Sequence, residues 1–384
     1  MRLRPLPVAP GPGAVEAMPA LREALAGGTP VLPYAAGGHP PRVPAGAVPA
    51  SGTALVLATS GSTGSPKLVM LAGHALAASA AATHERLGGP GRWLLAMPPH
   101  HVAGLQVLLR CVAAGTQPAF VDLSGGFTAA AFTTAAGAFH GERRYTAVVP
   151  TQLRRLLDDP AATAVLGRLD AVLVGGAATP AELLARARSA GVRAVTTYGM
   201  TETAGGCVYD GVPLSGSRVR ADDYGRLWLG GETLATGYLG RPDLTARAFR
   251  TDGGGRRWFR TDDTGHVDEA GHWRVDGRLD DVVVTGGLKV APGPVEEALL
   301  ALPEVAEAVV VGVPDDEWGQ VVSAALVLRV GATAPTVDAL RSRLRGAVPD
   351  HALPRRVVTL ASVPVRGPGK PDRAAVAAVV LRQE

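Results

Sequence analysis

The sequence has few of the residues that build disulfide frameworks, cysteine metal sites or membrane spans. It has two cysteines in 384 residues, Cys111 and Cys207. Because they are far apart and outside any metal-binding spacing, neither a disulfide framework nor a zinc site is predicted. No apolar run approaches the roughly 18 residues that a membrane helix needs, and the N-terminal segment is rich in proline and glycine, unlike a signal peptide. We therefore expect a globular, cytoplasmic protein without membrane insertion.

Lysine and aromatic residues are also scarce. Aromatics make up 4% of the chain, and only three of its 38 basic residues are lysines, at Lys67, Lys289 and Lys370. The net charge of +4 permits a nucleic-acid partner, but the arginines are scattered with few aromatics between them, which disfavours one. Since a compact ammonium binds differently from a planar guanidinium, the three lysines mark positions where that difference is expected to matter.

The chain length predicts two domains of unequal size. The first fifty residues show one amphipathic helix, at 15–25, and no evident chemistry. Strands, glycine turns and helices then alternate, as in the strand 171–174 and the helix 180–190, which is typical of α/β units around a largely parallel sheet. A β-rich subdomain follows. We predict a large α/β domain at 1–279 and a small α+β C-terminal domain at 280–384.

The most distinctive local feature is a hydroxyl- and glycine-rich loop that directly follows a predicted strand, and we call it the phosphate loop. It contains Thr59, Ser60, Gly61, Ser62, Thr63, Gly64, Ser65, Pro66 and Lys67. Backbone N–H groups, hydroxyls and an ammonium can together surround phosphate oxygens. The spacing differs from a P-loop, in which four residues separate the glycines and Gly-Lys-Ser/Thr opens a helix. Read alone, the same composition also suits a surface turn.

Further short segments are rich in glycine or in acidic and hydroxyl residues, and they follow one another along the chain. They are Gly175-Gly176-Ala177, Tyr198-Gly199-Met200-Thr201-Glu202, Thr261-Asp262-Asp263, Gly277-Arg278-Leu279-Asp280, Gly286-Gly287 and Gly367-Pro368-Gly369-Lys370. Each alone reads as an ordinary turn or helix start. Together with the phosphate loop they resemble the acyl-adenylate-forming superfamily, which includes acyl-CoA synthetases, luciferases and peptide-synthetase adenylation domains. The resemblance covers roughly residues 50 to 384.

The resemblance assigns nucleotide contacts to the central segments. Tyr198 would stack on adenine, Thr201 would contact the α-phosphate, and Glu202 would help to hold Mg²⁺, for which a carboxylate is a usual ligand. The turn at Gly175, Gly176 and Ala177 would lie along the adenosine, next to Gly199. Asp263 would bind the ribose hydroxyls together with Arg278, while Asp262 stands where the family usually has glycine and is an alternative ribose ligand.

The resemblance also assigns roles in the C-terminal part. Asp280 would be the hinge about which the small domain turns, and Gly286 and Gly287 would form the loop that serves thioester formation. Lys370 would orient the carboxylate and stabilise charge on the α-phosphate as pyrophosphate leaves. Lys289 either helps to hold coenzyme A or is a surface lysine. Val283 stands where many relatives have lysine.

Two segments bear on the acid substrate. His101 precedes a predicted helix, as a histidine does in the family, and residues 150–157 resemble the o-succinylbenzoate-CoA ligases of menaquinone biosynthesis. Arg154 and Arg155 are candidate partners for a second carboxylate, although a place on a helix surface is the alternative. The acid itself is suggested only by the resemblance.

The sequence therefore predicts an acid–thiol ligase that uses ATP, Mg²⁺ and coenzyme A on an aromatic carboxylic acid, with acyl-AMP as intermediate. A CoA ligase for another aryl or short acid and an enzyme that loads a carrier protein are the alternatives. A catalytically silent nucleotide-binding module is a more remote one. A homodimer is left open.

Overall fold

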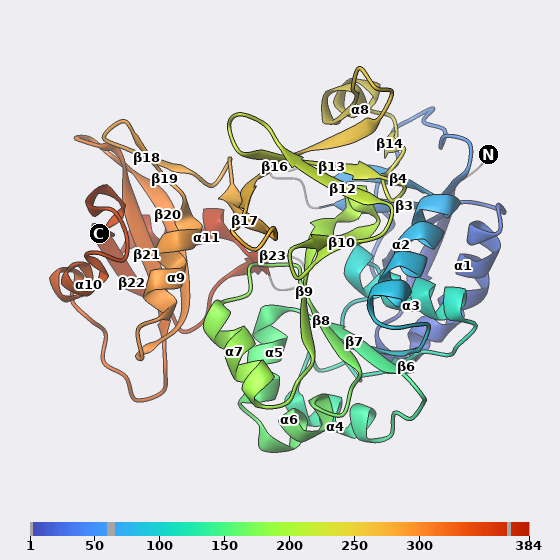
Figure 1. The fold of residues 1–384 in the computed structure, drawn as a ribbon, viewed down its shortest axis with the longest axis horizontal. Coiled ribbons are helices and arrows are strands. Elements are labelled where there is room, and N and C mark those ends of the chain that lie inside the picture. The colour runs from blue at the N-terminus through green and yellow to red at the C-terminus, as the bar shows by residue number, and fades with distance from the viewer. Residues whose placement is uncertain (1–2, 60–65, 367–369, 384) are drawn as a thin grey trace. The chain divides into compact units, whose positions relative to one another are not determined.

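The computed structural model describes residues 3–59, 66–366 and 370–383 (Figure 1). Its contacts divide the chain into two compact units. The large unit comprises Met1–Arg220 and Trp228–Thr261, and the small unit comprises Ala221–Leu227 and Asp262–Glu384. The second unit thus begins before residue 279. The boundary between residues 279 and 280, expected from the hinge, stays a prediction.

A seven-stranded sheet forms the centre of the large unit. Its order is β11-β10-β9-β8-β7-β5-β6, with β9 (Ala194–Met200), β8 (Ala171–Val174), β7 (Arg144–Val148), β5 (Arg92–Leu95) and β6 (Ala119–Phe120) all parallel. The strands β10 (Gly205–Tyr209) and β11 (Val212–Pro213) extend it in antiparallel pairing. Since the parallel strands point the same way, the segments that follow β7, β8 and β9 meet at one edge of the sheet.

Both faces of this sheet are buried. Alternate residues of one strand enter different cores, because successive side chains of a strand point to opposite faces. Leu95 belongs to the core shared with α2 (Gly73–Arg86) and α3 (Val102–Ala114), whereas Leu94 belongs to the core on the opposite side. That second core is covered by α4 (Ala129–Gly137), α5 (Pro150–Leu157), α6 (Pro160–Leu166) and α7 (Ala181–Ser189) (Figure 1). The expected α/β fold class is confirmed.

A second sheet of the large unit has the order β1-β2-β3-β4-β14. Its members are β1 (Arg4–Val8), β2 (Val31–Ala35), β3 (Thr53–Thr59), β4 (Lys67–Ala72) and β14 (Gly237–Tyr238). The sequence reading missed β1 and β2, because proline within a segment argues against a strand. Both prolines of β1 are tolerated because β1 is an edge strand, and β2 pairs with β3 only through Val31 and Leu55, so Pro33 lies beyond that ladder. The predicted helix at 15–25 is a 3₁₀ helix, Gly11–Ala17, followed by α1 (Met18–Leu25).

An antiparallel sheet with the order β12-β13-β16-β15, and with β17 on β16, follows along the chain. Its strands are β12 (Ser217–Ala221), β13 (Arg226–Gly231), β15 (Phe249–Thr251), β16 (Arg257–Val267) and β17 (Trp273–Arg278), and α8 (Pro242–Ala248) precedes β15. These are the short strands and turns that the sequence indicated after residue 198.

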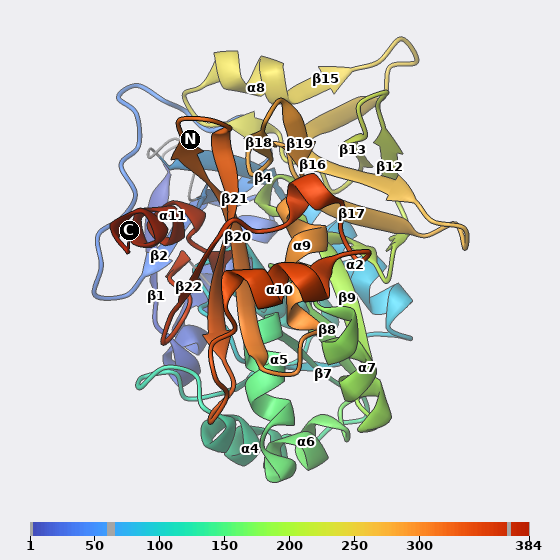
Figure 2. The same cartoon turned by 90° about the vertical axis from the view of Figure 1, so that its left-hand side faces the viewer.

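The small unit has its own core. It is built on a three-stranded sheet of β20 (Val305–Asp315), β21 (Gly319–Leu328) and β22 (Arg356–Thr359). The helices α9 (Pro292–Leu300) and α10 (Val337–Leu344) contribute to one hydrophobic cluster and α11 (Arg373–Arg382) to another (Figure 2). Two short hairpins complete it, β18 (Val283–Thr285) with β19 (Leu288–Val290) and β23 (Val365–Arg366) with β24 (Lys370–Pro371).

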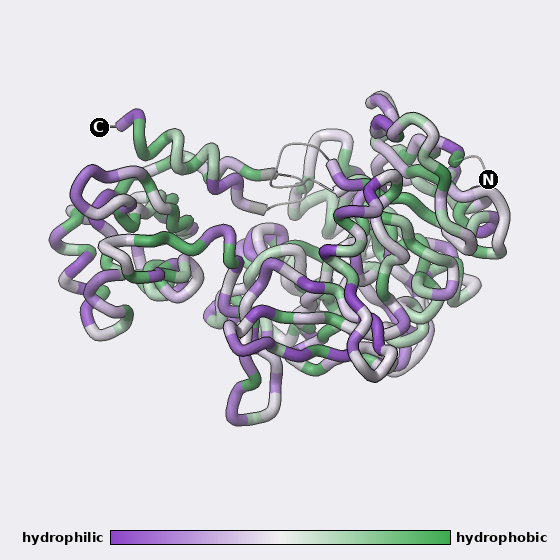
Figure 3. The backbone as a smooth tube through the Cα atoms, turned by 90° about the horizontal axis from the view of Figure 1, so that it is seen from above, coloured by the Kyte–Doolittle hydropathy of each residue, from purple (hydrophilic) through white to green (hydrophobic). Residues whose placement is uncertain are grey.

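Hydrophobic and hydrophilic stretches are interspersed along the chain (Figure 3). Within the described residues, no helix combines the length and the apolarity that a membrane crossing requires.

Candidate active site

The ends of the phosphate loop are brought together by a hairpin. Thr59 is the last residue of β3 and Lys67 the first of β4, and the two are paired in the antiparallel register. The Thr59 hydroxyl also donates to the Lys67 carbonyl at 3.4 Å. Ser60, Gly61, Ser62, Thr63 and Gly64 lie outside the described residues, so their predicted phosphate contacts stay predictions.

The Tyr-Gly segment forms a tight turn at the end of β9. Tyr198 and Gly199 are in the strand, and Thr201–Thr203 is a single 3₁₀ turn. A Cβ on Gly199 would lie 2.2 Å from the Gly205 carbonyl oxygen of the adjacent strand, so only glycine fits. The Thr203 hydroxyl donates to that same carbonyl at 2.7 Å and accepts from the Met200 N–H at 3.0 Å. These bonds fix the turn that carries Thr201 and Glu202.

Glu202 is a buried acid whose carboxylate has a defined partner. The residue is 8% exposed, and its Oε1 accepts a hydrogen bond from the Tyr238 hydroxyl at 2.9 Å. The Glu202 carbonyl also accepts from the Ala235 N–H at 2.8 Å. A buried carboxylate needs such hydrogen bonds because its desolvation is costly.

Tyr238 also links Glu202 to the phosphate loop. The Lys67 Nζ lies 5.4 Å from the centroid of the Tyr238 ring, within the range of a cation–π interaction. The structure therefore brings Lys67 and Glu202 to the same tyrosine, although they are 135 residues apart in the sequence. The sequence analysis did not single out Tyr238, because the Gly237-Tyr238 pair looks like part of an ordinary turn. The one signal was the scarcity of tyrosine, which occurs six times in the chain.

The glycine turn at residues 175–177 lies beside the Tyr-Gly segment. Gly175 follows β8, the parallel neighbour of β9, and a Cβ on Gly175 would lie 2.1 Å from the Thr197 Oγ1 of β9. Gly176 has a φ of +83°, which favours glycine. The structure thus places Gly175, Gly176 and Ala177 next to the end of β9, where the sequence predicted a nucleotide.

His101 lies at the start of α3, whose first turns pack against the turn after Glu202. It is the N-cap residue of α3, and its ring centroid is 4.2 Å from that of His100. Burial lowers the pKa of His100 below its ordinary value. Gln106, one turn further along α3, donates to the Ala204 carbonyl. His101 is therefore on a helix tied to the Glu202 turn, and its role in catalysis stays a prediction.

Arg154 and Arg155 differ in their surroundings. Both are on α5, but Arg154 is half-buried and Arg155 is exposed. The start of α5 is fixed by Gln152, whose side chain accepts from the Val149 N–H and donates to the Ala96 carbonyl.

In the small unit, Asp263 and Arg278 face each other across two strands. They are direct partners in the β16–β17 register, and Arg278 Nη1 lies 3.4 Å from Asp263 Oδ1. Arg278 also makes a bidentate contact with Asp280, at 2.8 and 2.7 Å. Burial opposes the charge of Arg278, but the hydrogen bonds and charge of Asp280 outweigh it and raise the Arg278 pKa above its ordinary value.

The two adjacent aspartates have different surroundings. The Asp263 side chain is 11% exposed, whereas that of Asp262 is 55% exposed and pairs with Arg226 at 3.0 Å. Of the two aspartates, Asp263 was the first candidate for binding the ribose together with Arg278. Asp263 is also the one that lies directly opposite Arg278 in the β16–β17 ladder.

The glycine loop at 286–287 turns between β18 and β19. Gly286 has a φ of +55°, its N–H donates to the Trp318 carbonyl at 3.0 Å, and a Cβ there would lie 2.7 Å from the Trp318 ring. Lys289 is exposed in β19, whereas Val283 is 1% exposed in the core of the small unit. The loop needs glycine because of this close approach.

Lys370 begins β24, where it pairs with Arg366 of β23. Three residues later, Arg373 Nε contacts Asp281 Oδ2 at 3.0 Å and its Nη1 contacts Glu296 Oε1 and the Val310 carbonyl at 2.5 and 2.6 Å. Burial opposes the charge of Arg373, but the hydrogen bond and charge of Glu296 outweigh it, with Asp281 adding to them, so its pKa is raised. The segment that follows Lys370 is thereby joined to α9, to β20 and to the residue after the predicted hinge.

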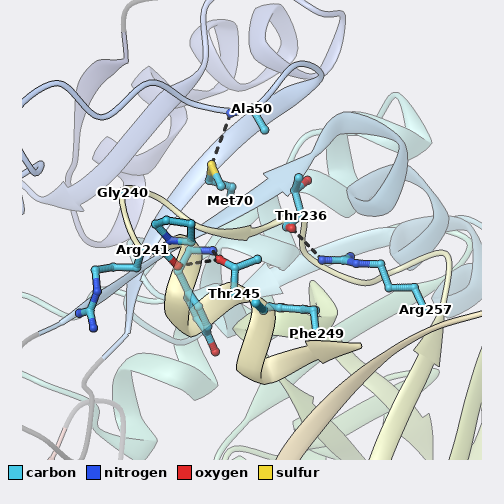
Figure 4. Close-up of a pocket in the computed structure, with 11 residues that line it drawn as sticks. Ala50, Met70, Thr236, Gly240, Arg241, Thr245, Phe249 and Arg257 are labelled. Atoms are coloured by element: carbon cyan, nitrogen blue, oxygen red, sulfur yellow. Dashed lines mark hydrogen bonds between the residues drawn. The ribbon is translucent and has the colours of Figure 1, made fainter. Parts of the chain in front are cut away.

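A pocket of about 520 Å³ lies beside β14. Its lining includes Met70, Thr236, Tyr238, Phe249 and Arg257 (Figure 4). No group of three or more His, Cys, Asp or Glu side chains with metal-binding geometry occurs within the described ranges.

Comparison with known proteins gives the family of the chain. Residues 14–239 match the AMP-binding enzyme family, and residues 294–370 match the AMP-binding enzyme C-terminal domain. The chain belongs to the AMP-binding enzyme family, and its fold is that of the acyl-adenylate-forming enzymes. The resemblance stated from the motifs is confirmed.

Relatives and solved structures refine this likeness. The chain is 45% identical to a probable 2-succinylbenzoate–CoA ligase of Mycobacterium tuberculosis over 97% of both chains. It is 26% identical to the o-succinylbenzoate CoA synthetase of Bacillus subtilis in complex with its acyl-adenylate, with a TM-score of 0.72 over 84% of this chain and 69% of that one. The same enzyme with ATP and magnesium is 27% identical, with a TM-score of 0.70 over 84% and 69%. An amide bond synthetase of Marinactinospora thermotolerans is 30% identical, with a TM-score of 0.75 over 85% and 70%.

Proposed function

We propose that this protein is an AMP-forming acid–CoA ligase that activates o-succinylbenzoate with ATP and then transfers the acyl group to coenzyme A. The observation that carries the ATP part is the convergence of Lys67 and Glu202 on Tyr238. It brings a cation at the end of the phosphate loop and an oriented carboxylate to the same tyrosine, which suits binding of a metal–polyphosphate. The acid and the thiol acceptor are supported by the relatives' names.

The first step would be attack of the substrate carboxylate on the α-phosphorus, with pyrophosphate as the leaving group. Lys67 would hold the polyphosphate, Thr201 would contact the α-phosphate, and Lys370 would balance the charge that develops there. Glu202 fits a magnesium ion that arrives with ATP, since one carboxylate together with phosphate oxygens is a usual ligand set. The ion would neutralise phosphate charge. Asp263 and Arg278 would serve the ribose, while Tyr198 and the 175–177 turn would serve the adenosine.

In the second step the coenzyme A thiol would attack the acyl carbon and AMP would leave. The Gly286–Gly287 loop would serve this step, with Asp280 as the hinge. Position 283 holds a buried valine. The lysine that many relatives have at this position therefore has no counterpart in this chain.

The acid is tested with a panel assayed for AMP release in the presence of ATP and coenzyme A. We expect o-succinylbenzoate to give a kcat/KM at least ten-fold above those of benzoate, a cinnamate and succinate. A higher kcat/KM for one of the other acids would contradict the choice of acid while leaving the ligase chemistry intact.

The acceptor is tested in the same assay. Thioester formation with free coenzyme A supports the proposal. Transfer only to a carrier protein or to an amine, the latter as the name of the Marinactinospora neighbour would suggest, would contradict it.

The second carboxylate of o-succinylbenzoate provides a finer test at α5. If Arg154 pairs with it, Arg154→Gln lowers kcat/KM for o-succinylbenzoate and leaves that for benzoate unchanged. Arg155→Gln is the matched control, because Arg155 is exposed on the same helix. Equal losses on both acids would assign Arg154 a structural role.

A location in the cytoplasm, a place in menaquinone biosynthesis and a homodimeric state stay predictions.

A further inference from the structure

Tyr238 contacts two candidate site residues, one through its hydroxyl and one through its ring. The hydroxyl donates to Glu202 Oε1 at 2.9 Å, and the ring faces the Lys67 ammonium with 5.4 Å between Nζ and the ring centroid. The residue is 4% exposed. A hydrogen bond to a charged group in a buried setting is stronger than one between neutral groups.

The position of Tyr238 is itself fixed by the fold. It is paired with Val69 in the β14–β4 ladder, so it belongs to the same strand pair that holds Lys67. Its N–H donates to the Thr245 hydroxyl at 2.9 Å, and its ring packs against Phe249 with 5.8 Å between centroids. The Tyr238 ring therefore has little freedom to move.

A second support comes from Arg257. Its guanidinium donates to the Thr236 carbonyl at 2.7 Å (Figure 4). It also donates to the Ala235 carbonyl at 2.6 Å and lies over the Phe249 ring at 4.4 Å. Burial lowers the pKa of Arg257. Because the Ala235 N–H donates to the Glu202 carbonyl, the segment 235–238 holds Glu202 at two points, its backbone and its carboxylate.

We propose that Tyr238 is a positioning residue for magnesium–ATP, which sets the orientation of the Glu202 carboxylate and its distance from Lys67. This inference rests on the proposed function, because it concerns the same nucleotide. The tyrosine hydroxyl restricts the rotation of the carboxylate, so one oxygen has a fixed direction before the ligand arrives. Preorganisation of this kind increases affinity by lowering the ordering cost of binding.

The test separates the hydroxyl from the ring. Tyr238→Phe keeps the ring beneath Lys67 and removes only the donor to Glu202. ATP and AMP affinities are measured by titration calorimetry at a series of magnesium concentrations, with no acid or coenzyme A present. We expect the magnesium concentration at half-maximal ATP affinity to rise about ten-fold, the effect of losing one hydrogen bond to a charged group. The affinity for AMP without magnesium should change less than about two-fold.

Two comparisons exclude a merely structural effect. Tyr145→Phe is the matched control, because the Tyr145 hydroxyl is likewise bonded inside the large unit, to the carbonyls of Leu87 and Gly89, and lies outside the candidate site. It should leave the magnesium dependence unchanged. In a Glu202→Gln background, Tyr238→Phe should add no further change in magnesium dependence, since the two residues act as one unit.

Some results would overturn the inference. An unchanged or lower magnesium requirement in Tyr238→Phe, or equal losses of ATP and AMP affinity, would show that the hydroxyl only supports packing. These results would leave the proposed function standing if the wild-type protein still made a CoA thioester. Conversely, Tyr238→Phe could raise the magnesium requirement while the wild-type protein makes no thioester from any acid. That result would refute the proposed function and leave the inference about Tyr238 standing.

Discussion

At the scale of single residues, the candidate site residues are oriented by hydrogen-bond partners. The Glu202 carboxylate accepts a hydrogen bond from Tyr238, and the Arg278 guanidinium contacts both Asp263 and Asp280. The phosphate loop, the Tyr-Gly segment and the segments of Asp263 and Arg278 could be singled out from the sequence because their residue types are unusual in combination, and their ligand contacts stay predictions. Tyr238 was not singled out, because its role comes from the pairing of β14 with β4, a contact between segments more than 160 residues apart.

Lys370 allows the two half-reactions to be separated. Lys370→Ala should lose most pyrophosphate release, about a hundred-fold or more, since it removes a charge that acts on the developing phosphate charge. The same variant should still convert supplied acyl-AMP into thioester. Single-turnover assays of each half-reaction measure this. Lys289→Ala is the control, because Lys289 is exposed, and it should leave pyrophosphate release unchanged. Equal loss of both half-reactions in Lys370→Ala would refute the division of roles.

His84 makes the stability of the large unit dependent on pH. Burial, and next the charge of Arg110, lower its pKa from 6.5 to about 4, and its Nε2 accepts from the Trp93 indole N–H at 3.3 Å. The unfolded chain therefore binds a proton below pH 6.5 that the folded chain does not. Stability is fully present above about pH 6.5 and falls as the pH drops toward 4, by up to about 3 kcal/mol.

The measurement is denaturant unfolding between pH 7.5 and 4.5 for the wild type and His84→Gln. Glutamine does not titrate and can accept from Trp93, so the variant should lose less stability on acidification. Parallel pH profiles of the two proteins would rule out His84 as the cause.

At the scale of elements, glycines set how closely neighbouring strands approach at the site. Gly199→Ala would place a Cβ 2.2 Å from a backbone oxygen, while Gly175→Ala would place one 2.1 Å from a side-chain oxygen, that of Thr197. We expect both variants to lose AMP affinity by ten-fold or more. Adding Thr197→Ala should partly restore the AMP affinity of the Gly175→Ala variant. It should not restore the AMP affinity of Gly199→Ala, because a side-chain change does not remove the backbone carbonyl that the new Cβ meets there.

Gly137→Ala is the control for these variants. Gly137 is the last residue of α4, with nothing within 4 Å of a Cβ there, so alanine should be neutral or slightly stabilising. AMP titrations and melting temperatures are measured for all of these variants. Full AMP affinity in Gly199→Ala would show that the β9 turn does not shape the nucleotide site.

The small unit depends on the ion-pair cluster at the start of α11. Arg373→Met would leave Glu296 and Asp281 without their cation and the Val310 carbonyl without one donor. Since the Arg373 side chain is 26% exposed, solvent screens part of the effect, and we expect a loss of about 1–3 kcal/mol. Arg382→Met, at the exposed end of the same helix, should change stability by less than about 0.5 kcal/mol. Thermal unfolding compares them, and similar values would contradict a structural role for the cluster.

At the scale of the whole molecule, the sequence predicted the fold class and the alternation of strands and helices after the first fifty residues, including the strand 171–174. Strands such as 171–174 were recognised because apolar runs bounded by glycine are unambiguous. The strands β1 and β2 were missed because their prolines are compatible with a sheet only at particular places in its ladder, which depend on the neighbouring strands. The acid could be predicted only by resemblance, since the walls of an acyl pocket come from distant segments.

The central claim is that one chain activates an acid by forming acyl-AMP and passes the acyl group to coenzyme A. It is tested most directly by incubating the purified protein with o-succinylbenzoate, ATP, Mg²⁺ and coenzyme A and quantifying every product by mass spectrometry. We predict AMP, pyrophosphate and o-succinylbenzoyl-CoA in equal amounts, with acyl-AMP accumulating when coenzyme A is omitted. Formation of ADP and phosphate, or of thioester without AMP, would contradict it.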